Sequence, residues 1–301
     1  MKNATKTAAA APQTNQSIKK RTMAQETWRR FKKNKGAMVG ASIIVLLILI
    51  SIFAPMIIDW DTQIVAMNMR ERLQTPSLKH PFGTDYMGRD IFLRILYGAR
   101  YSLTIGVLSI AIACAGGFIL GCIAGFKGGW VENIIMRLGD IVRGVPGTLL
   151  CIALCAALGQ GMTNMILACG LGGIVTFMTY TRASVLSVRG NEYIEAAKAI
   201  GATDWQIITK HVMPNAMSPI IVQVSMRIGG TIITAAGMSF LGLGIPLPTP
   251  EWGAMLSDGR PYITTCPWMT IFPGLAILVT VISFNLMGDG LRDALDPKLK
   301  T

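Results

Sequence analysis

Long stretches without any charged residue alternate with short polar segments along this chain. Residues 36–58, 101–126, 144–181 and 261–288 carry no Asp, Glu, Lys or Arg, and residues 215–244 carry only Arg227. A helix needs about 20 apolar residues to cross the hydrocarbon core of a bilayer, and the Gly-Gln-Gly triplet at 159–161 indicates a turn that divides the longest stretch. The pattern predicts six transmembrane helices, at 38–57, 102–125, 134–158, 162–186, 217–243 and 268–288.

Composition also indicates an all-α membrane protein. Apolar residues make up 51% of the 301-residue chain, and charged residues make up only 15%, against roughly a quarter in soluble domains. Five of the six cysteines fall inside predicted spans, and Cys266 lies alone outside them. We therefore expect the cysteines to act as small apolar fillers and to form no disulfide within the chain.

Basic residues predict the orientation of the chain in the membrane. The first 37 residues hold ten Lys or Arg and a single acid, Glu26, and such an excess is typical of cytoplasmic segments. Six spans then return the C-terminus to the cytoplasm. Because the bases behind the net charge of +12 flank membrane spans, we expect the partner to be the lipid bilayer and expect no nucleic-acid partner. The expected regions are a cytoplasmic tail at 1–37, an extracytoplasmic loop at 58–101, a membrane domain at 102–289 and a cytoplasmic tail at 290–301.

Catalytic signatures are missing from the sequence. There is no G-x-x-x-x-G-K-[ST] phosphate-binding loop and no G-x-S-x-G, and the two histidines are far apart. We therefore expect no enzymatic activity, no ATP hydrolysis, no metal site and no cofactor bound by this chain.

Arg227 is the one charge well inside a predicted span, ten residues after the start of the fifth. A cation at that depth needs a partner or a water-filled lumen, and the sequence supports a translocation path and a structural ion pair equally. A self-sufficient channel or an ion-coupled carrier is a rival function. Such carriers usually keep acids deep in the helix bundle, and acids are nearly absent from these spans.

Small residues recur at intervals of four along the second predicted span. A stripe at this spacing lets a second helix backbone approach closely. The sequence leaves open whether that second helix belongs to this chain or to another subunit. The residues of the stripe are Ser109, Ala113, Gly117, Gly121 and Gly125.

A polar insert at 187–216 separates the fourth and fifth predicted spans. Asn191 is placed to cap a first helix, and Gly201 supplies the left-handed residue that stops it. Thr203-Asp-Trp-Gln206 matches the S/T-x-x-E/Q capping box, which predicts a second helix at once. Pro214 is expected to end that helix. The apolar residues expected to line the two helices are Tyr193, Ala197, Ile200, Trp205, Ile208 and Val212.

Two interpretations of the insert compete. It could lie on lipid headgroups as an amphipathic helix, or it could dock into a groove of a soluble partner. A helix that faces lipid usually carries an excess of Lys and Arg on its polar side. The insert instead sets Lys198 and Lys210 against three acids, Glu192, Glu195 and Asp204. This balance favours a protein partner.

The same residues resemble a known signature. Glu195-Ala196-Ala197, then Gly201 and Pro214, resemble the E-A-A-x3-G-x9-I-x-L-P motif of bacterial ABC-importer membrane subunits, except that His211 and Met213 replace the aliphatic residues before the proline. Further segments resemble the C-type permeases of the dipeptide, oligopeptide and nickel group. They are HPFGTDYMGRDIFLRILYGARYSL at 80–103, IIMRLGDIVRGVP at 134–146, SFLGLGIPLPTPEWGAML at 239–256 and FNLMGDGLRDALDPKLK at 284–300.

The resemblance implies a type I ABC-importer permease fold in the bacterial cytoplasmic (inner) membrane, with a coupling helix inside the insert. It implies a heterodimer with a B-type permease, two ATPase subunits that bind ATP and Mg, and an extracytoplasmic solute-binding protein. The implied transport is inward movement of dipeptides or oligopeptides, with nickel or glutathione as alternatives. The implied ATPase-coupling residues are Glu195, Ala196, Ala197, Gly201, Trp205 and Pro214.

Two outer segments are candidates for contact with the binding protein. Asp85 and Arg89 lie before the second span, where local bracing is the stronger alternative. Glu251 and Trp252 follow three closely spaced prolines in the loop before the last span, where contact and anchoring at the membrane interface are equally supported.

Overall fold

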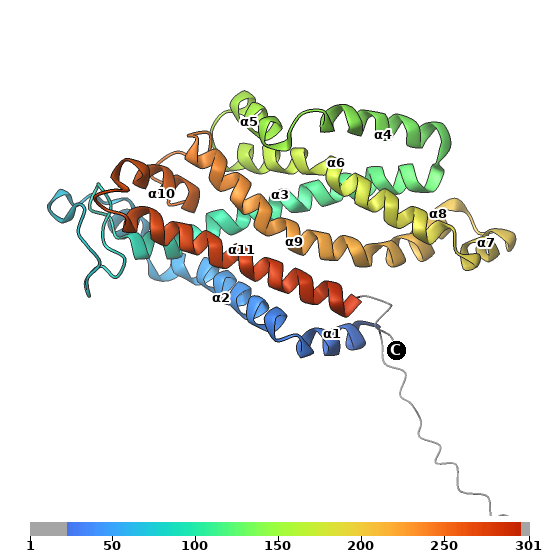
Figure 1. Ribbon diagram of the computed structural model, residues 1–301, viewed down its shortest axis with the longest axis horizontal. Coiled ribbons are helices and arrows are strands. Elements are labelled where there is room, and N and C mark those ends of the chain that lie inside the picture. Colours follow the sequence, from blue (N-terminus) through green and yellow to red (C-terminus); the bar gives the residue numbers. More distant parts are fainter. Residues whose placement is uncertain (1–22, 296–301) are drawn as a thin grey trace, which may run out of the picture.

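The protein is a bundle of long helices from which two short helices project at one end (Figure 1). The computed structural model describes residues 23–295, and the predicted tail segments at 1–22 and 296–301 lie outside the described residues. Across the described range the chain forms no β-strand, only an isolated bridge between Thr84 and Asp90. The α-helices are α1 Met23–Lys33, α2 Lys35–Ile57, α3 Ile91–Lys127, α4 Gly129–Arg143, α5 Gly147–Leu158, α6 Met162–Arg189, α7 Glu192–Ala199, α8 Asp204–Ile207, α9 Met213–Phe240, α10 Trp252–Gly259 and α11 Trp268–Leu295.

Five helical segments are long and apolar enough to cross a bilayer. They are Lys35–Ile57, Ile91–Lys127, Met162–Arg189, Asp204–Phe240 and Trp268–Leu295. The second of them begins well before the predicted residue 102. Asp90 caps it by accepting a hydrogen bond from the Leu93 N–H at 3.0 Å, and Arg94 is buried with its guanidinium donating to the Ile64 carbonyl at 2.9 Å. A buried charged side chain that is hydrogen-bonded in this way does not end a helix. The charge-free stretch of sequence therefore underestimates the length of α3.

The single helix expected at 134–158 is wrong, because this region is broken. Helices α4 and α5 meet at 83°. The chain has a sixth span only if this bent pair is taken as one broken span. Pro146 lies between them and pushes Val145 out of helical geometry. Glu132 of α4 pairs with Arg182 of α6, yet most of α4 is exposed.

Helices α3 and α6 form the most closely packed pair. Every residue of the predicted small-residue stripe is buried. A Cβ added at Gly117 would lie 2.5 Å from the Phe177 Cβ, and one added at Gly121 would lie 2.5 Å from the Met178 carbonyl oxygen. No larger residue fits without moving α6. The second helix that the sequence left open is therefore α6 of the same chain.

The remaining long helices pack around this pair. Helix α11 lies between α2 and α9 (Figure 1), and a Cβ at Gly288 would lie 2.6 Å from the Met226 side chain of α9. Residues 23–33, expected to belong to a tail, form α1, because Phe31 is buried with Ala37 and Ala294. All six cysteines are free, as expected.

Candidate functional site at the helical insert

Helices α7 and α8 lie at one end of the bundle, and α10 with the loop before α3 lies at the opposite end (Figure 1). The insert follows α6 and leads through a π-helical turn, Ile208–Val212, into α9. The chain is therefore helical almost without interruption from Met162 to Phe240, with one sharp turn between α7 and α8.

That turn is defined by backbone geometry and by two sets of hydrogen bonds. Gly201 has φ +83°. The Ala202 N–H donates to the Ala197 carbonyl at 3.1 Å, and the Gly201 N–H donates to the Lys198 carbonyl at 3.0 Å. This is the Schellman arrangement, with glycine at the left-handed position. An L side chain at Gly201 would be strained even though its Cβ would meet nothing within 4 Å.

The second helix starts with a complete capping box. The Thr203 hydroxyl accepts a hydrogen bond from the Gln206 N–H at 3.4 Å, and the Gln206 side chain accepts one from the Thr203 N–H at 2.9 Å. The predicted cap at Asn191 has the right position and extended backbone but makes no side-chain cap. Its amide instead donates to the Val188 carbonyl at 3.0 Å, which ties the start of α7 to the end of α6.

An apolar cluster anchors the insert to the spans. Ile194 and Ile207 are fully buried, with 0% of each side chain exposed. They pack in one cluster with Cys122 and Phe126 of α3 and with residues of α6 and α9. The Ser184 hydroxyl adds a hydrogen bond to the Ala216 carbonyl at 3.0 Å, from α6 to α9. The insert is thus continuous with the hydrophobic interior and does not hang from flexible linkers.

The exposed surface of the insert is apolar around the turn between α7 and α8, at Ile200 and Trp205, which we call the crest, and acidic in the first turn of α7. Ile200 is 87% exposed and Trp205 is 73% exposed, and Tyr193 is also exposed. Glu195 and Ala196 lie exposed on α7. Among the described residues, Glu195 has no ion-pair partner. Exposed Ile and Trp side chains and an unpaired carboxylate, carried by one fixed insert, are typical of a helical surface that docks into a protein groove.

Three expectations about the insert need correction: a helix end at Pro214, an exposed Ala197, and a shared apolar face for Trp205 and Val212. Pro214 does not end a helix, because it lies at the start of α9, where its missing N–H is not needed. The π-helical turn before it carries the chain straight into the span. Ala197 and Val212 face inward, whereas Trp205, expected beside Val212, faces out. Ala197 is small because it packs inside the chain, and of the two alanines only Ala196 is open to a partner.

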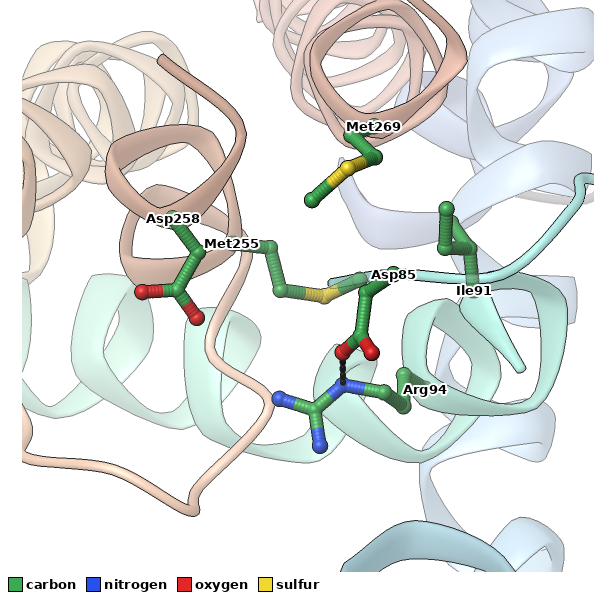
Figure 2. A pocket seen from close by; sticks show the side chains of 6 residues that line it. All are labelled: Asp85, Ile91, Arg94, Met255, Asp258 and Met269. Atoms are coloured by element: carbon green, nitrogen blue, oxygen red, sulfur yellow. Dashed lines mark ion pairs between the residues drawn. The ribbon is translucent and has the colours of Figure 1, made fainter. Parts of the chain in front are cut away.

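Asp85 and Arg89, at the end of the bundle opposite the insert, are buried, so the expected exposed contact with a binding protein is wrong for them. Arg89 is 2% exposed, and its Nε donates to the Asp85 carboxylate at 2.6 Å. Figure 2 shows Arg94 beside Asp85, with Asp258 of α10 across a cavity of about 10 Å³. The Arg94 Nε lies 3.9 Å from an Asp85 carboxylate oxygen. The cavity has room for about one water molecule and no larger ligand. We call these four residues, Asp85, Arg89, Arg94 and Asp258, the outer brace, because they hold α3 to α10 at the end of the bundle away from the insert.

Glu251 and Trp252 are buried as well, so the expected exposed contact or interfacial anchor is also wrong. Trp252 is 1% exposed, and its indole N–H donates to the Ile95 carbonyl at 3.0 Å. Glu251 caps α10, with its carboxylate accepting from the Gly253 and Ala254 N–H groups at 2.9 and 2.8 Å. Burial raises the pKa of Glu251 above its usual range, and these hydrogen bonds only partly oppose the effect.

The sequence analysis did not identify several residues that hold the insert and the outer brace in place. Ile194 and Ile207 anchor the insert, and the spacing of Ile194 three residues before Ala197 is the signal that would have identified the inward face. Arg94 and Asp258 belong to the outer brace, but they lie far apart in the sequence and no local pattern joins them. Within residues 23–295, no group of three or more His, Cys, Asp or Glu side chains is arranged to hold a metal ion.

Comparison with known proteins identifies the family of the chain. Residues 117–301 match the family described as binding-protein-dependent transport system inner membrane component, and residues 22–76 match the N-terminal transmembrane domain of oligopeptide transport permease C. The dipeptide transport system permease protein of Alkalihalophilus pseudofirmus is 46% identical over 92% of this chain and 90% of its own length. The glutathione transport system permease protein of Pectobacterium atrosepticum is 44% identical over 93% of each chain.

Two solved structures share the fold at low sequence identity. A chain of the inward-facing MetNI methionine ABC transporter aligns with a TM-score of 0.56 at 18% identity, over 68% of this chain and 98% of that one. A chain of an amino acid ABC transporter aligns with a TM-score of 0.52 at 13% identity, over 65% of this chain and 91% of that one. The protein belongs to the family of inner membrane components of binding-protein-dependent transport systems, as a C-type ABC-importer permease, and is a transport subunit rather than an enzyme.

Proposed function

We propose that this chain forms one half of a peptide-importing ABC permease and that α7 is its coupling helix. The other half is a B-type permease, and two separate ATPase subunits bind ATP and Mg against the cytoplasmic face. An extracytoplasmic binding protein delivers the substrate. The dipeptide and glutathione permeases that resemble this chain along more than nine-tenths of its length support a small peptide as the substrate. Nickel remains the alternative cargo.

The observation that carries the proposal is the construction of the insert. An ATP-driven subunit can move spans only through a contact that transmits force, and a flexible loop would absorb that movement. Here the exposed crest at Ile200 and Trp205 sits on two capped helices whose inner residues, Ile194 and Ile207, are buried against α3 and α6. The proposal includes the orientation, with α7, α8 and both chain ends on the cytoplasmic side, which the ten basic residues among the first 37 support.

The test is a charge reversal on the exposed face. Glu195 is exposed and unpaired among the described residues, so Glu195→Lys should leave the chain folded and inserted while weakening ATPase binding and ATP-driven uptake. Gly201→Asp should act in the same direction by straining the turn. Asp61→Lys is the matched control, since Asp61 is an exposed acid near the opposite end of the bundle. Normal co-purification of both ATPases with Glu195→Lys, together with normal uptake, would exclude this docking surface.

A further inference from the structure

Arg227 lies at the centre of α9 and has no partner in the described chain. It follows Met213 by fourteen residues and precedes Phe240 by thirteen, which places it about 20 Å from either end of the helix. Its side chain is exposed, and no side-chain hydrogen bond or ion pair joins it to any residue from 23 to 295. A cation at this depth is found in membrane proteins where it faces water or an opposite charge.

The surroundings of Arg227 form a polar face of α9. We define this face as Gln223, Arg227, Gly230, Thr231, Thr234 and Gly237, which share one side of the helix by their spacing of three, four and seven. All six are exposed or half-exposed, whereas the other side of α9, including Ile228 and Ile232, is buried.

Open space lies in front of this face. A Cβ added at Gly230 or Gly237 would meet nothing within 4 Å, whereas one at Gly229 would lie 3.3 Å from Val281 of α11. The Thr231 and Thr234 hydroxyls donate to carbonyls of their own helix, Arg227 and Gly230, at 3.0 and 3.1 Å. The guanidinium of Arg227 and the amide of Gln223 are then the polar groups of the face left free to bind.

The four spans α2, α3, α6 and α9 contain no Asp or Glu, and the two acids of α11, Asp289 and Asp293, lie in its last two turns. In the broken sixth span, Glu132 pairs with Arg182, and the exposed Asp140 makes no ion pair with Arg227. Within residues 23–295, no acid of the spans therefore neutralises Arg227. A guanidinium presents paired N–H donors that match a carboxylate. A peptide in transit carries such a group at its C-terminus at neutral pH.

We propose that Arg227 receives the C-terminal carboxylate of the transported peptide and that the polar face of α9 lines its path. The inference rests on the proposed import function and adds to it a substrate-contacting residue. Dipeptides and glutathione share a free carboxylate, so one cation at this position serves both kinds of substrate. Arg227→Lys keeps the charge but lacks the planar paired N–H donors of the guanidinium, so it should bind the carboxylate less tightly.

The first experiment measures maximal uptake by the complete transporter in proteoliposomes. The binding protein is supplied loaded with dipeptide at saturation, so its own affinity does not enter the comparison. Arg227→Gln should lower maximal uptake about tenfold, the effect of losing one hydrogen bond to a charged group. Arg227→Lys should fall between this variant and the wild type. Arg292→Gln, the loss of an exposed cation in the last turn of α11, is the matched control and should leave uptake unchanged.

The second experiment needs no binding protein. Thr231→Cys places a thiol one turn from an intact Arg227, in a Cys114→Ser background because Cys114 is the one native cysteine that is not buried. A charged, membrane-impermeant methanethiosulfonate should label Cys at 231 in the assembled transporter. A dipeptide with a free C-terminus should slow the labelling severalfold, the same dipeptide amidated at its C-terminus should not, and Arg227→Gln should abolish the protection.

The outcomes separate this inference from the proposed function. Failure of the wild type to take up peptide with ATP would reject the import function itself. With uptake intact, the carboxylate site is excluded if position 231 never labels, because the face is then covered by lipid or by the partner permease. Equal protection by free and amidated dipeptide would exclude it too. So would an Arg227→Gln variant that falls apart into separate subunits, because Arg227 would then pair with an acid of the other permease.

Discussion

The anchoring of the insert at 187–216, the proposed coupling element, can be tested by removing one buried side chain. Ile194 is fully buried beneath α7, and Ile194→Ala deletes three carbons from that contact. At about 0.8 kcal/mol per buried CH₂ the transfer contribution is about 2.4 kcal/mol, and the cavity left behind brings the expected loss to about 2–4 kcal/mol. The cluster is local to the insert, so the loss should appear as easier opening of 192–207 rather than as unfolding of the bundle.

Amide hydrogen exchange of the assembled transporter measures this opening directly. Since 1.4 kcal/mol corresponds to a factor of ten, exchange across α7 and α8 should accelerate between about thirtyfold and several hundredfold. The ATPase subunits should still bind, because the exposed residues of the insert are unchanged. Peptide moved per ATP hydrolysed should fall, since a loosened insert absorbs part of the movement.

Ile200→Ala is the matched control for this variant. It removes the same atoms from a side chain that is 87% exposed on the same insert. Exchange should therefore stay at the wild-type level, while ATPase binding should weaken. The reasoning is refuted if Ile194→Ala accelerates exchange and leaves the ratio of transport to ATP hydrolysis unchanged, because stiffness would then play no part in coupling.

Three further predictions concern the rest of the chain. Gly121→Leu should lower thermal stability in detergent by about 1–3 kcal/mol or more, through overpacking against α6, whereas Gly147→Leu, where a Cβ meets nothing, should not. Glu251 holds its proton more tightly when folded, so wild-type stability should fall relative to Glu251→Gln as pH rises above 4.5, as measured by melting temperature. Arg89→Ala should cost about 3–5 kcal/mol by leaving Asp85 buried without its main partner, and pairing it with Asp85→Ala should restore part of the loss in a double-mutant cycle.

The sequence predicted the local features of the fold because their causes are local. Gaps between charges locate five spans, since the bilayer core excludes charge along a single helix. Gly201 and the capping box at Thr203 were found because the residues that stop and start a helix are neighbours in the chain. The small-residue stripe predicted close packing for the same reason, but the identity of the partner helix needed the structure.

The wrong predictions share a different cause. Asp85, Arg89, Glu251 and Trp252 are polar or amphipathic residues in loops, and such residues are usually exposed. Their burial depends on partners distant in sequence, such as Glu251 with Ser102 and Trp252 with Ile95. The break between α4 and α5 was missed because an apolar count alone does not register a proline.

Helix α3 connects the outer brace to the insert. It is capped by Asp90 beside the brace, interlocks with α6 along its glycine stripe, and ends with Phe126 in the cluster that holds Ile194 and Ile207. Its 37 residues span about 55 Å without a break. The glycines of α3 let its backbone lie so close to α6 that the two helices cannot slide past each other independently. Movement of the insert must therefore carry α3, α6 and the outer brace as one body. Helix α9 belongs to the same body, because the insert runs straight into it and a Cβ added at Gly106 of α3 would lie 2.6 Å from Ile232 of α9. If the proposed partner permease is present, the change in access is expected where this body, with the polar face of α9, meets that second subunit.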